Sequence, residues 1–234
     1  MAYIFEYIRA MGHEPLHLEK HYARLKELTE KYFSEPLLLS QEEVQKAIVQ
    51  TLQLKRCSTS AMNYACVRCF DNNTIEVDAD WMIYEQFSLR AIHPQVYLCQ
   101  ASGDILTDNT SAKEALVKFN NDSALIDERG VAVWTSEQNE VLAIDGSPVV
   151  AVFDDEVRFS DKGKGVEFDL AYEAFSAYNS TVTKGAIVVD ELHKAKELLF
   201  IDYRGVTAIK QWFDKALYMD LTAERIASLI AEKE

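Results

Sequence analysis

The chain has 234 residues, with 24 lysine and arginine side chains against 38 aspartate and glutamate side chains and a formal net charge of −14. Proteins hold nucleic acids and anionic membrane surfaces mainly through a surplus of basic side chains, so this composition argues against both as partners. Hydrophobic residues make up 48% and glycine and proline number only 8 and 4, which is typical of a globular protein with a sizeable core.

The first half of the chain predicts a small unit of strands and helices. Ser40-Gln-Glu-Glu43 has the pattern of a capping box, in which the serine and the glutamate bond each other's backbone amides and start a helix. In chain order, the predicted elements are a strand over 4–10, a helix over 18–32, a helix from the box to about 54, a hairpin of strands 63–70 and 74–78, and further strand over 87–99. We assign these elements to a domain of residues 1–98.

The second half predicts a larger α/β domain of residues 104–234. The polar stretch Ala101-Ser-Gly-Asp104 is interpreted as a linker, and the apolar run 149–153 is typical of a buried strand. The other predicted elements are helices over 110–119, 166–178, 190–198 and 222–232, and strands over 123–127, 131–133, 187–189 and 199–201. The fold class is therefore α+β with two domains.

Location and cysteine chemistry follow from the same sequence. No apolar run approaches the roughly 18 residues that a membrane span requires, and charges interrupt the first ten residues, where a secretory signal would be apolar. We expect a cytoplasmic protein with reduced cysteines. Cys66 and Cys69 form a Cys-x-x-Cys pair without a second ligand pair at short spacing, so we favour small strand residues over a metal or redox site and predict no metal.

One pattern near the N-terminus points to a known family. Phe5-Glu-Tyr-Ile-Arg9, then Gly12, then His21-Tyr-Ala-Arg24-Leu25, resembles the opening of the class IV aminotransferases, the fold type IV group of pyridoxal phosphate (PLP) enzymes that includes the aminodeoxychorismate lyases. The resemblance implies a D-amino acid aminotransferase-like fold in which Arg24 clasps the PLP phosphate, as suits a planar guanidinium. It also makes Arg9 a candidate substrate-binding residue, although an arginine on a strand could equally pair with a neighbouring acid.

Two further stretches resemble the same family, in the same order along the chain. Trp134-Thr-Ser-Glu-Gln-Asn139 is similar to a family turn of the form Glu-Gly-Ser-x-x-Asn, which makes Thr135, Ser136 and Asn139 candidate cofactor-binding residues. Leu199-Phe-Ile-Asp-Tyr-Arg-Gly-Val206 is similar to the Asn-x-x-Arg-Gly-Ile of the lyases.

Three positions depart from the family pattern. The lysine that holds PLP would fall at about residue 104 or 105, where this chain has none, and Lys113 in the following helix is the nearest candidate catalytic lysine. Trp134 stands where a carboxylate would face the pyridine nitrogen, and an indole has a donor but no anionic acceptor. Glu167, in Gly165-Val-Glu-Phe168, stands where a hydroxyl would donate to the cofactor phosphate.

These observations leave two hypotheses. The first is a divergent class IV protein with a degenerate PLP site and weak or lost PLP chemistry, which binds a small anionic ligand near Arg9 and Arg24 or serves as an interaction protein. The second is an active 4-amino-4-deoxychorismate lyase, which would use Lys113 and PLP to release pyruvate and 4-aminobenzoate for folate biosynthesis. The resemblance implies a homodimer in both cases.

Overall fold

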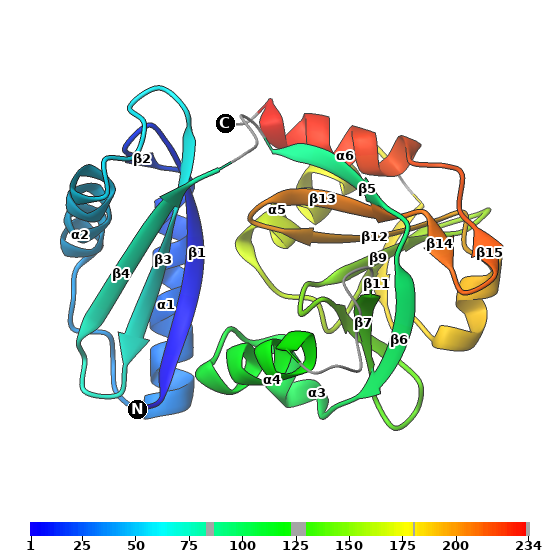
Figure 1. Cartoon of the computed structure of the whole chain (residues 1–234), viewed down its shortest axis with the longest axis horizontal. Coiled ribbons are helices and arrows are strands. Elements are labelled where there is room, and N and C mark those ends of the chain that lie inside the picture. Colours follow the sequence, from blue (N-terminus) through cyan, green and yellow to red (C-terminus); the bar gives the residue numbers. More distant parts are fainter. Residues whose placement is uncertain (83–86, 123–129, 180, 233–234) are drawn as a thin grey trace. The chain divides into compact units, whose positions relative to one another are not determined.

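A computed structural model describes residues 1–82, 87–122, 130–179 and 181–232. The fold divides into two compact units (Figure 1). Unit 1 contains Met1–Gln86 and Asn109–Ala112, and unit 2 contains Phe87–Asp108 and Lys113–Glu234.

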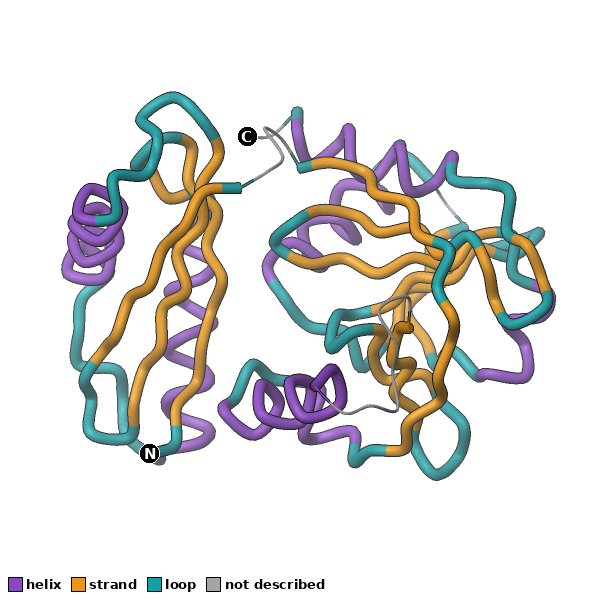
Figure 2. Tube along the Cα trace, viewed as in Figure 1, coloured by secondary structure: helices purple, strands orange, loops and turns teal. Residues whose placement is uncertain are grey.

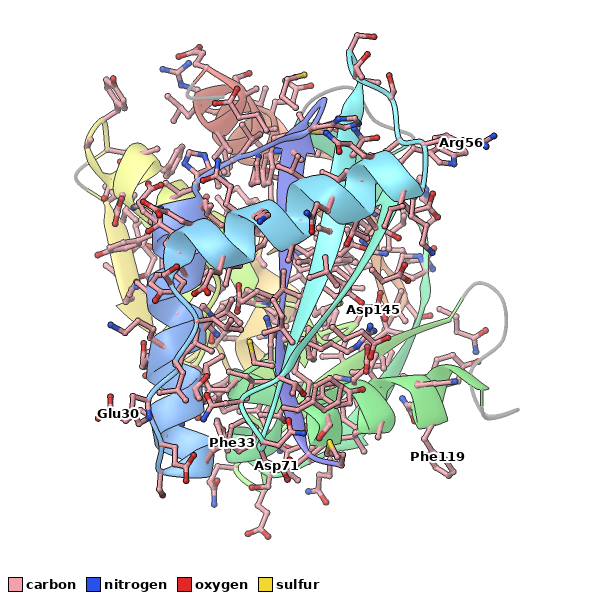
Figure 3. The ribbon with its side chains drawn as sticks, turned by 90° about the vertical axis from the view of Figure 1, so that its left-hand side faces the viewer. Glu30, Phe33, Arg56, Asp71, Phe119 and Asp145 are labelled. Atoms are coloured by element: carbon pink, nitrogen blue, oxygen red, sulfur yellow. The ribbon has the colours of Figure 1, made fainter. Side chains whose placement is uncertain are left out.

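Unit 1 is an antiparallel sheet of four strands, in the order β2-β1-β3-β4, with two helices on one face. Its elements are β1 (Tyr3–Met11), β2 (Glu14–Pro15), α1 (Leu18–Phe33), α2 (Gln41–Leu54), β3 (Met62–Phe70) and β4 (Ile75–Trp81). The strands form one layer in Figure 2, and Figure 3 shows α1 and α2 over the same face of that layer, with Phe33 marking the end of α1. The predicted strands, helices and hairpin of this part of the chain are therefore confirmed, including the capping box, in which the Ser40 hydroxyl accepts from the Glu43 amide at 3.2 Å and Glu43 Oε2 accepts from the Ser40 amide at 2.8 Å.

The two faces of β1 have different roles. Ile4 and Ile8 belong to the apolar core shared with α1 and α2, and strand alternation puts Glu6 on that same face. Phe5 and Tyr7 lie on the opposite face, where their rings contact each other edge-on at 5.6 Å. The strand therefore carries a single carboxylate into a helix-covered, apolar layer.

A short later segment completes unit 1. Strand β2 pairs only with the last two residues of β1, Ala10 and Met11. The beginning of β1 is instead bonded by segment 109–112, because the Phe5 amide donates to the Asn109 carbonyl at 2.9 Å and Ile4 forms an antiparallel bridge with Thr110. The chain thus returns to unit 1 after entering unit 2.

Unit 2 is built on a six-stranded sheet in the order β11-β10-β9-β12-β13-β5, next to a three-stranded sheet in the order β6-β7-β8 and a small β14-β15 hairpin. Its strands are β5 (Ser88–Ile92), β6 (Gln95–Gln100), β7 (Gly130–Thr135), β8 (Val141–Ile144), β9 (Val149–Val152), β10 (Val157–Ser160), β11 (Val182–Gly185), β12 (Glu197–Asp202), β13 (Gly205–Ile209), β14 (Gln211–Trp212) and β15 (Lys215–Ala216). Its helices are α3 (Gly103–Thr107), α4 (Ser111–Asp122), α5 (Val166–Ser176), α6 (Leu221–Ala231) and a 3-10 helix over Val189–Lys194.

Three apolar clusters hold unit 2 together. Helices α5 and α6 pack on one face of the large sheet, through buried side chains that include Phe159, Phe168 and Ile226. The other face packs against β7 and β8, through side chains such as Val133, Ile144 and Phe200. A smaller cluster joins β7 and β8 to α3 and α4.

The structure differs from several sequence predictions in this unit. The expected strand 87–99 is two strands, β5 and β6, interrupted at His93 and Pro94, and they pair with β13 and β7 of unit 2. The predicted division into 1–98 and 104–234 therefore differs from the observed one. The stretch interpreted as a linker leads directly into α3. The predicted strand 123–127 lies outside the described residues.

The largest error concerns residues 187–201. The predicted helix over 190–198 is wrong, because the helical segment is a 3-10 helix that ends at Lys194 and strand β12 begins at Glu197. Strand β12 also takes in the predicted strand 199–201, whereas the predicted strand 187–189 is not formed and Val189 begins the 3-10 helix. Strand β12 lies between β9 and β13, so the sheet pairing on both of its edges overrides the helical spacing of its apolar residues.

Candidate functional site

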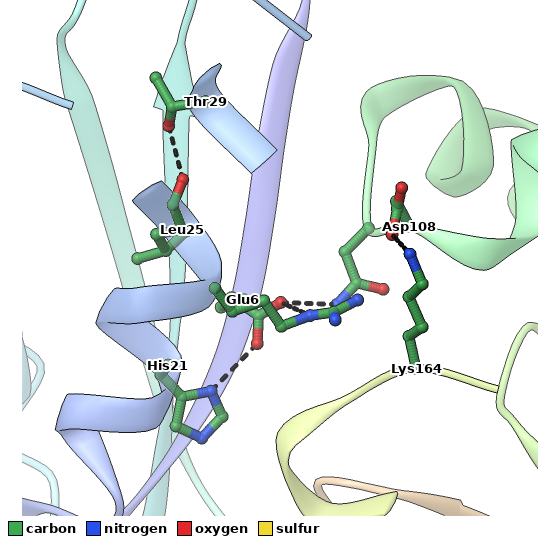
Figure 4. Close-up of polar contacts among 8 residues, drawn as sticks. Glu6, His21, Leu25, Thr29, Asp108 and Lys164 are labelled. Atoms are coloured by element: carbon green, nitrogen blue, oxygen red, sulfur yellow. Dashed lines mark hydrogen bonds and ion pairs between the residues drawn. The ribbon is translucent and has the colours of Figure 1, made fainter. Parts of the chain in front are cut away.

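In unit 1, three donors converge on Glu6 (Figure 4). Glu6 is only 2% exposed, and its Oε2 lies 3.0 Å from His21 Nδ1. Its Oε1 accepts from Arg24 Nε at 2.8 Å and from Asn109 Nδ2 at 3.2 Å. The cluster therefore joins β1, helix α1 and segment 109–112 through one buried carboxylate.

Electrostatics keep this carboxylate ionised. Burial alone would raise the pKa of Glu6, but the hydrogen bond to His21 and the charge of Arg24 outweigh it and leave the pKa below its ordinary value. The same negative charge, after the larger effect of burial, raises the pKa of the nearby Cys69 thiol to about 12. Cys69 is therefore a protonated core residue at neutral pH, as its predicted role requires.

The side chains of Arg9 and Arg24 lie on opposite faces of the unit 1 sheet. Arg24 bonds Glu6 on the face covered by the helices, whereas Arg9, three residues after Glu6, lies on the opposite face with Phe5 and Tyr7. Tyr64 of β3 is on this second face as well, with its ring 6.0 Å from that of Tyr7. Arg9 is 2% exposed, so its guanidinium is buried on the face of the sheet that carries these aromatic rings.

In unit 2, Trp134 belongs to the small apolar cluster formed by β7, β8 and α3. The side chain is 3% exposed and packs with Leu106, Leu142 and Ala143. Its Nε1 has no hydrogen-bond acceptor among the described residues. A buried donor without an acceptor is unusual and energetically unfavourable, so apolar packing is what holds the indole in place.

Three of the four predicted cofactor-binding residues, Thr135, Ser136 and Asn139, build a tight turn after β7. The Ser136 hydroxyl accepts from the amides of Gln138 and Glu140, both at 3.2 Å, and the Asn139 amide donates to the Ser136 carbonyl at 3.0 Å. Asn139 has a φ of 59°, a left-handed conformation that asparagine tolerates better than most residues. Thr135 is buried at the end of the strand. Their local role is to connect β7 to β8.

Lys113 lies in the first turn of α4 and is 8% exposed, so its side chain is buried rather than solvated. Its stem packs near the Asp145-Gly146 turn, because a Cβ placed on Gly146 would lie 3.7 Å from Lys113 Cε. Burial to this degree is unusual for a lysine side chain.

A second charged cluster surrounds the turn between β12 and β13. Asp202 accepts from Arg204 Nε at 3.0 Å and from Arg90 Nη2 at 3.4 Å, and Arg204 also lies 3.7 Å from Asp145. Although burial would lower the pKa of Arg204, the charge and hydrogen bonds of Asp202 raise it. Basic and acidic groups alternate here, so the cluster neutralises its own charge.

Two acidic side chains lie in the first turn of α5. Gly165 is the N-cap and provides no side-chain hydrogen bond, while Glu167 and Asp169 lie in the first turn. Their carboxylates interact favourably with the partial positive charge at a helix N-terminus. Lys164, just before this helix, pairs with the buried Asp108 at 3.6 Å (Figure 4).

Sequence reasoning singled out His21 and Arg24 but missed Glu6 and Asn109 as their partners. The signal for Glu6 was present, because Ile4, Glu6 and Ile8 alternate on one face of a strand and a buried carboxylate needs donors. Among the described residues, no group of three or more histidine, cysteine or acidic side chains could hold a metal ion. No helix in the described ranges is long and apolar enough to cross a membrane.

Comparisons with known proteins rest on structure alone, because no family model and no curated protein matches the sequence. The fold is similar to a branched-chain aminotransferase from Thermoproteus uzoniensis, with a TM-score of 0.79 and 14% identity over 99% of this chain and 86% of that one. It is similar to a Legionella pneumophila protein provisionally described as a 4-amino-4-deoxychorismate lyase, with a TM-score of 0.76 and 12% identity over 99% and 91%.

A hypothetical aminotransferase from Mycobacterium tuberculosis, solved in a PLP-bound form, matches with a TM-score of 0.73 and 14% identity over 99% of this chain and 90% of that one. All three matches span nearly the whole chain. They confirm the predicted fold class, a two-unit α+β fold of the class IV aminotransferase type.

Proposed function

We propose that this chain, which has the fold of the class IV aminotransferases, has a degenerate PLP site and binds a small anionic ligand without PLP chemistry. The observation that carries the proposal is Trp134. At the position where the resemblance implies a carboxylate for the pyridine nitrogen, the chain has a buried indole, packed among apolar side chains, with no acceptor to offer.

The start of α5 supports the same conclusion. A cofactor phosphate would be held by free amides and the helix dipole at this position, but Glu167 and Asp169 already place carboxylates in the first turn. Like charges at short range repel, so these residues disfavour a phosphate. The residues in these two places do not fit PLP.

The anionic ligand is proposed from the two arginines of unit 1. Arg24 presents a guanidinium next to Glu6, and Arg9 is buried on the aromatic face of β1. Guanidinium groups bind carboxylates and phosphates in a bidentate manner, and aromatic neighbours suit a ligand with a flat apolar part. Arg24 is the proposed anion-binding residue, and Arg9 a proposed contact for a carboxylate on the opposite face.

A second candidate function is an active 4-amino-4-deoxychorismate lyase. The specific observation in its favour is the burial of Lys113 in unit 2. A lysine in a desolvated setting is the type of amine that can hold PLP, and PLP would supply the electron sink for the reaction. Thr135, Ser136 and Asn139 would then be the proposed residues near the cofactor.

Labelling with PLP distinguishes the two candidates. After incubation with one equivalent of PLP and reduction with borohydride, we expect mass spectrometry to find no adduct confined to a single lysine. We also expect the absorption spectrum of added PLP to remain that of the free compound. An adduct confined to one lysine contradicts the degenerate site.

The variants Lys113→Met and Lys118→Met provide the matched comparison. Both lysines lie on α4, but Lys118 is exposed. A single adduct that disappears in Lys113→Met and persists in Lys118→Met identifies Lys113 as the cofactor lysine and supports the lyase.

The homodimer implied by the resemblance is also proposed for this chain. Sedimentation velocity at micromolar concentration is expected to give one species with twice the mass of the 26.6 kDa chain. A single species at the mass of one chain over the same concentration range excludes a stable dimer.

A further inference from the structure

Glu6 is the common acceptor of three donors from separate segments of unit 1. We propose that Glu6 is the positioning residue that orients the Arg24 guanidinium toward the oxyanion of the ligand. This inference rests on the proposed function of Arg24 as the anion-binding residue, and adds that Arg24 binds the anion more tightly when Glu6 holds it in place.

The atoms used in the Glu6–Arg24 bond indicate how the orientation is achieved. Glu6 Oε1 accepts from Nε of Arg24 at 2.8 Å. Nε lies on the side edge of the planar guanidinium, whereas the two terminal nitrogens form the edge at its tip. A bond at Nε fixes the plane of the group and directs the tip edge away from the carboxylate. That edge has the fork geometry that matches two oxygens of a phosphate or carboxylate.

The other two donors hold Glu6 itself in place. His21 Nδ1 lies 3.0 Å from Oε2, so the oxygen that does not contact Arg24 is also fixed. Asn109 Nδ2 donates to Oε1 at 3.2 Å, and the backbone of Asn109 is anchored by the amide of Phe5. In Figure 4 the bond from His21 reaches Glu6 from the side of α1. A carboxylate bonded at both oxygens has little freedom to rotate, and it transmits this rigidity to Arg24.

The positioning role can be separated from a simple charge effect because the two predict opposite results. Glu6 carries a negative charge near a site for an anion, so removing that charge alone would strengthen anion binding. Removing a positioning residue weakens binding, because the ligand must then order a mobile guanidinium. Glu6→Gln keeps the shape of the side chain and removes the charge. It therefore tests whether anion affinity falls or rises.

The experiment is calorimetric titration of the full chain with inorganic phosphate. We expect Glu6→Gln to bind phosphate about tenfold more weakly than the original protein. Glu27→Gln makes the same change of net charge at an exposed position of α1 and is expected to bind as the original protein does. Arg24→Lys keeps the positive charge but lacks Nε and the fork, and is expected to lose binding.

The outcomes are distinguishable. Equal or tighter phosphate binding by Glu6→Gln, with binding lost in Arg24→Lys, overturns the positioning role and leaves the proposed function of Arg24 intact. No phosphate binding by the original protein overturns the function of Arg24 and the positioning role with it.

A measurement on the original protein covers the case in which Glu6→Gln does not fold. Nuclear magnetic resonance of the arginine side chains is expected to show a slowly exchanging Nε–H of Arg24 with a scalar coupling or contact to the Glu6 carboxylate. A rapidly exchanging, averaged Arg24 signal without phosphate overturns the inference.

Discussion

Replacing Glu6 by alanine is expected to destabilise the protein by about 3–5 kcal/mol. The change removes a buried carboxylate and leaves the basic side chains that bond it without that acceptor. Arg24 and His21 would keep their buried donors but lose the acceptor they share. Chemical denaturation followed by circular dichroism measures the effect. Glu27→Ala, at an exposed position of the same unit, is expected to change stability by no more than about 0.5 kcal/mol.

The contribution of Glu6 should depend on pH in a defined direction. Burial alone would raise its pKa, but the bond to His21 and the charge of Arg24 lower the pKa in the folded state below the ordinary value of 4.5. As the pH falls, the unfolded chain therefore binds this proton first. The stabilisation is complete above the unfolded value and is lost as the pH falls through the lower folded value.

Comparison of the original protein with Glu6→Gln tests this direction. The difference in unfolding free energy is expected to be larger at about pH 7 than at about pH 3, since below the unfolded pKa proton uptake by the unfolded chain reduces the stabilisation that the ionised carboxylate provides and the variant lacks. A difference that stays constant over this range, or grows in acid, contradicts an ionised Glu6 in the folded protein.

Replacing Gly205 by alanine is expected to have the second large effect, about 3 kcal/mol or more. Gly205 begins β13 with a φ of 130°, a conformation that costs other residues about 1–3 kcal/mol. A Cβ at this position would also lie 2.1 Å from the Ser88 carbonyl oxygen of the paired strand β5. Backbone atoms of a sheet cannot move aside as a flexible side chain does, so the pairing of β5 with β13 must loosen.

Gly185→Ala is the matched control for this prediction. Gly185 also lies at one end of a strand, β11, but a Cβ there would meet only the Arg158 side chain at 3.6 Å, an ordinary contact. We expect Gly205→Ala to lower the denaturation midpoint strongly and Gly185→Ala to change it little. Similar midpoints for the two variants would show that β5 adapts to the added methyl group.

The elements that the sequence predicted well are those whose signals are local. The capping box at Ser40, the helical spacing within α1 and the turn between β3 and β4 depend on neighbours within a few residues, and all three are formed. Strands β5, β6 and β12 find their partners far away in the sequence. Nothing in a local pattern indicates that 88–92 pairs with 205–209. The sequence pattern therefore joins β5 and β6 into one strand of the first domain and predicts a helix over the first residues of β12.

The candidate site shows the same contrast between features with local sequence signals and features that depend on distant parts of the chain. The spacing of His21 and Arg24 identifies two side chains on one face of a helix, and a strand pattern puts Glu6 and Arg9 on opposite faces. Both features could be predicted. The contact from Asn109 could not, because it depends on the chain returning to β1 about a hundred residues later. The burial of Lys113 likewise depends on its packing against the Asp145-Gly146 turn, which lies in another part of unit 2.

The return of segment 109–112 to β1 has a consequence for how this protein can be divided. A fragment cut at residue 86 would lack the partner of the Phe5 amide and the side chain that bonds Glu6 from Asn109. The exposed strand border would be open to pairing with a second molecule. Residues 1–86 therefore cannot be transferred to another protein by themselves. Any exchange of this unit between relatives must include segment 109–112 as well.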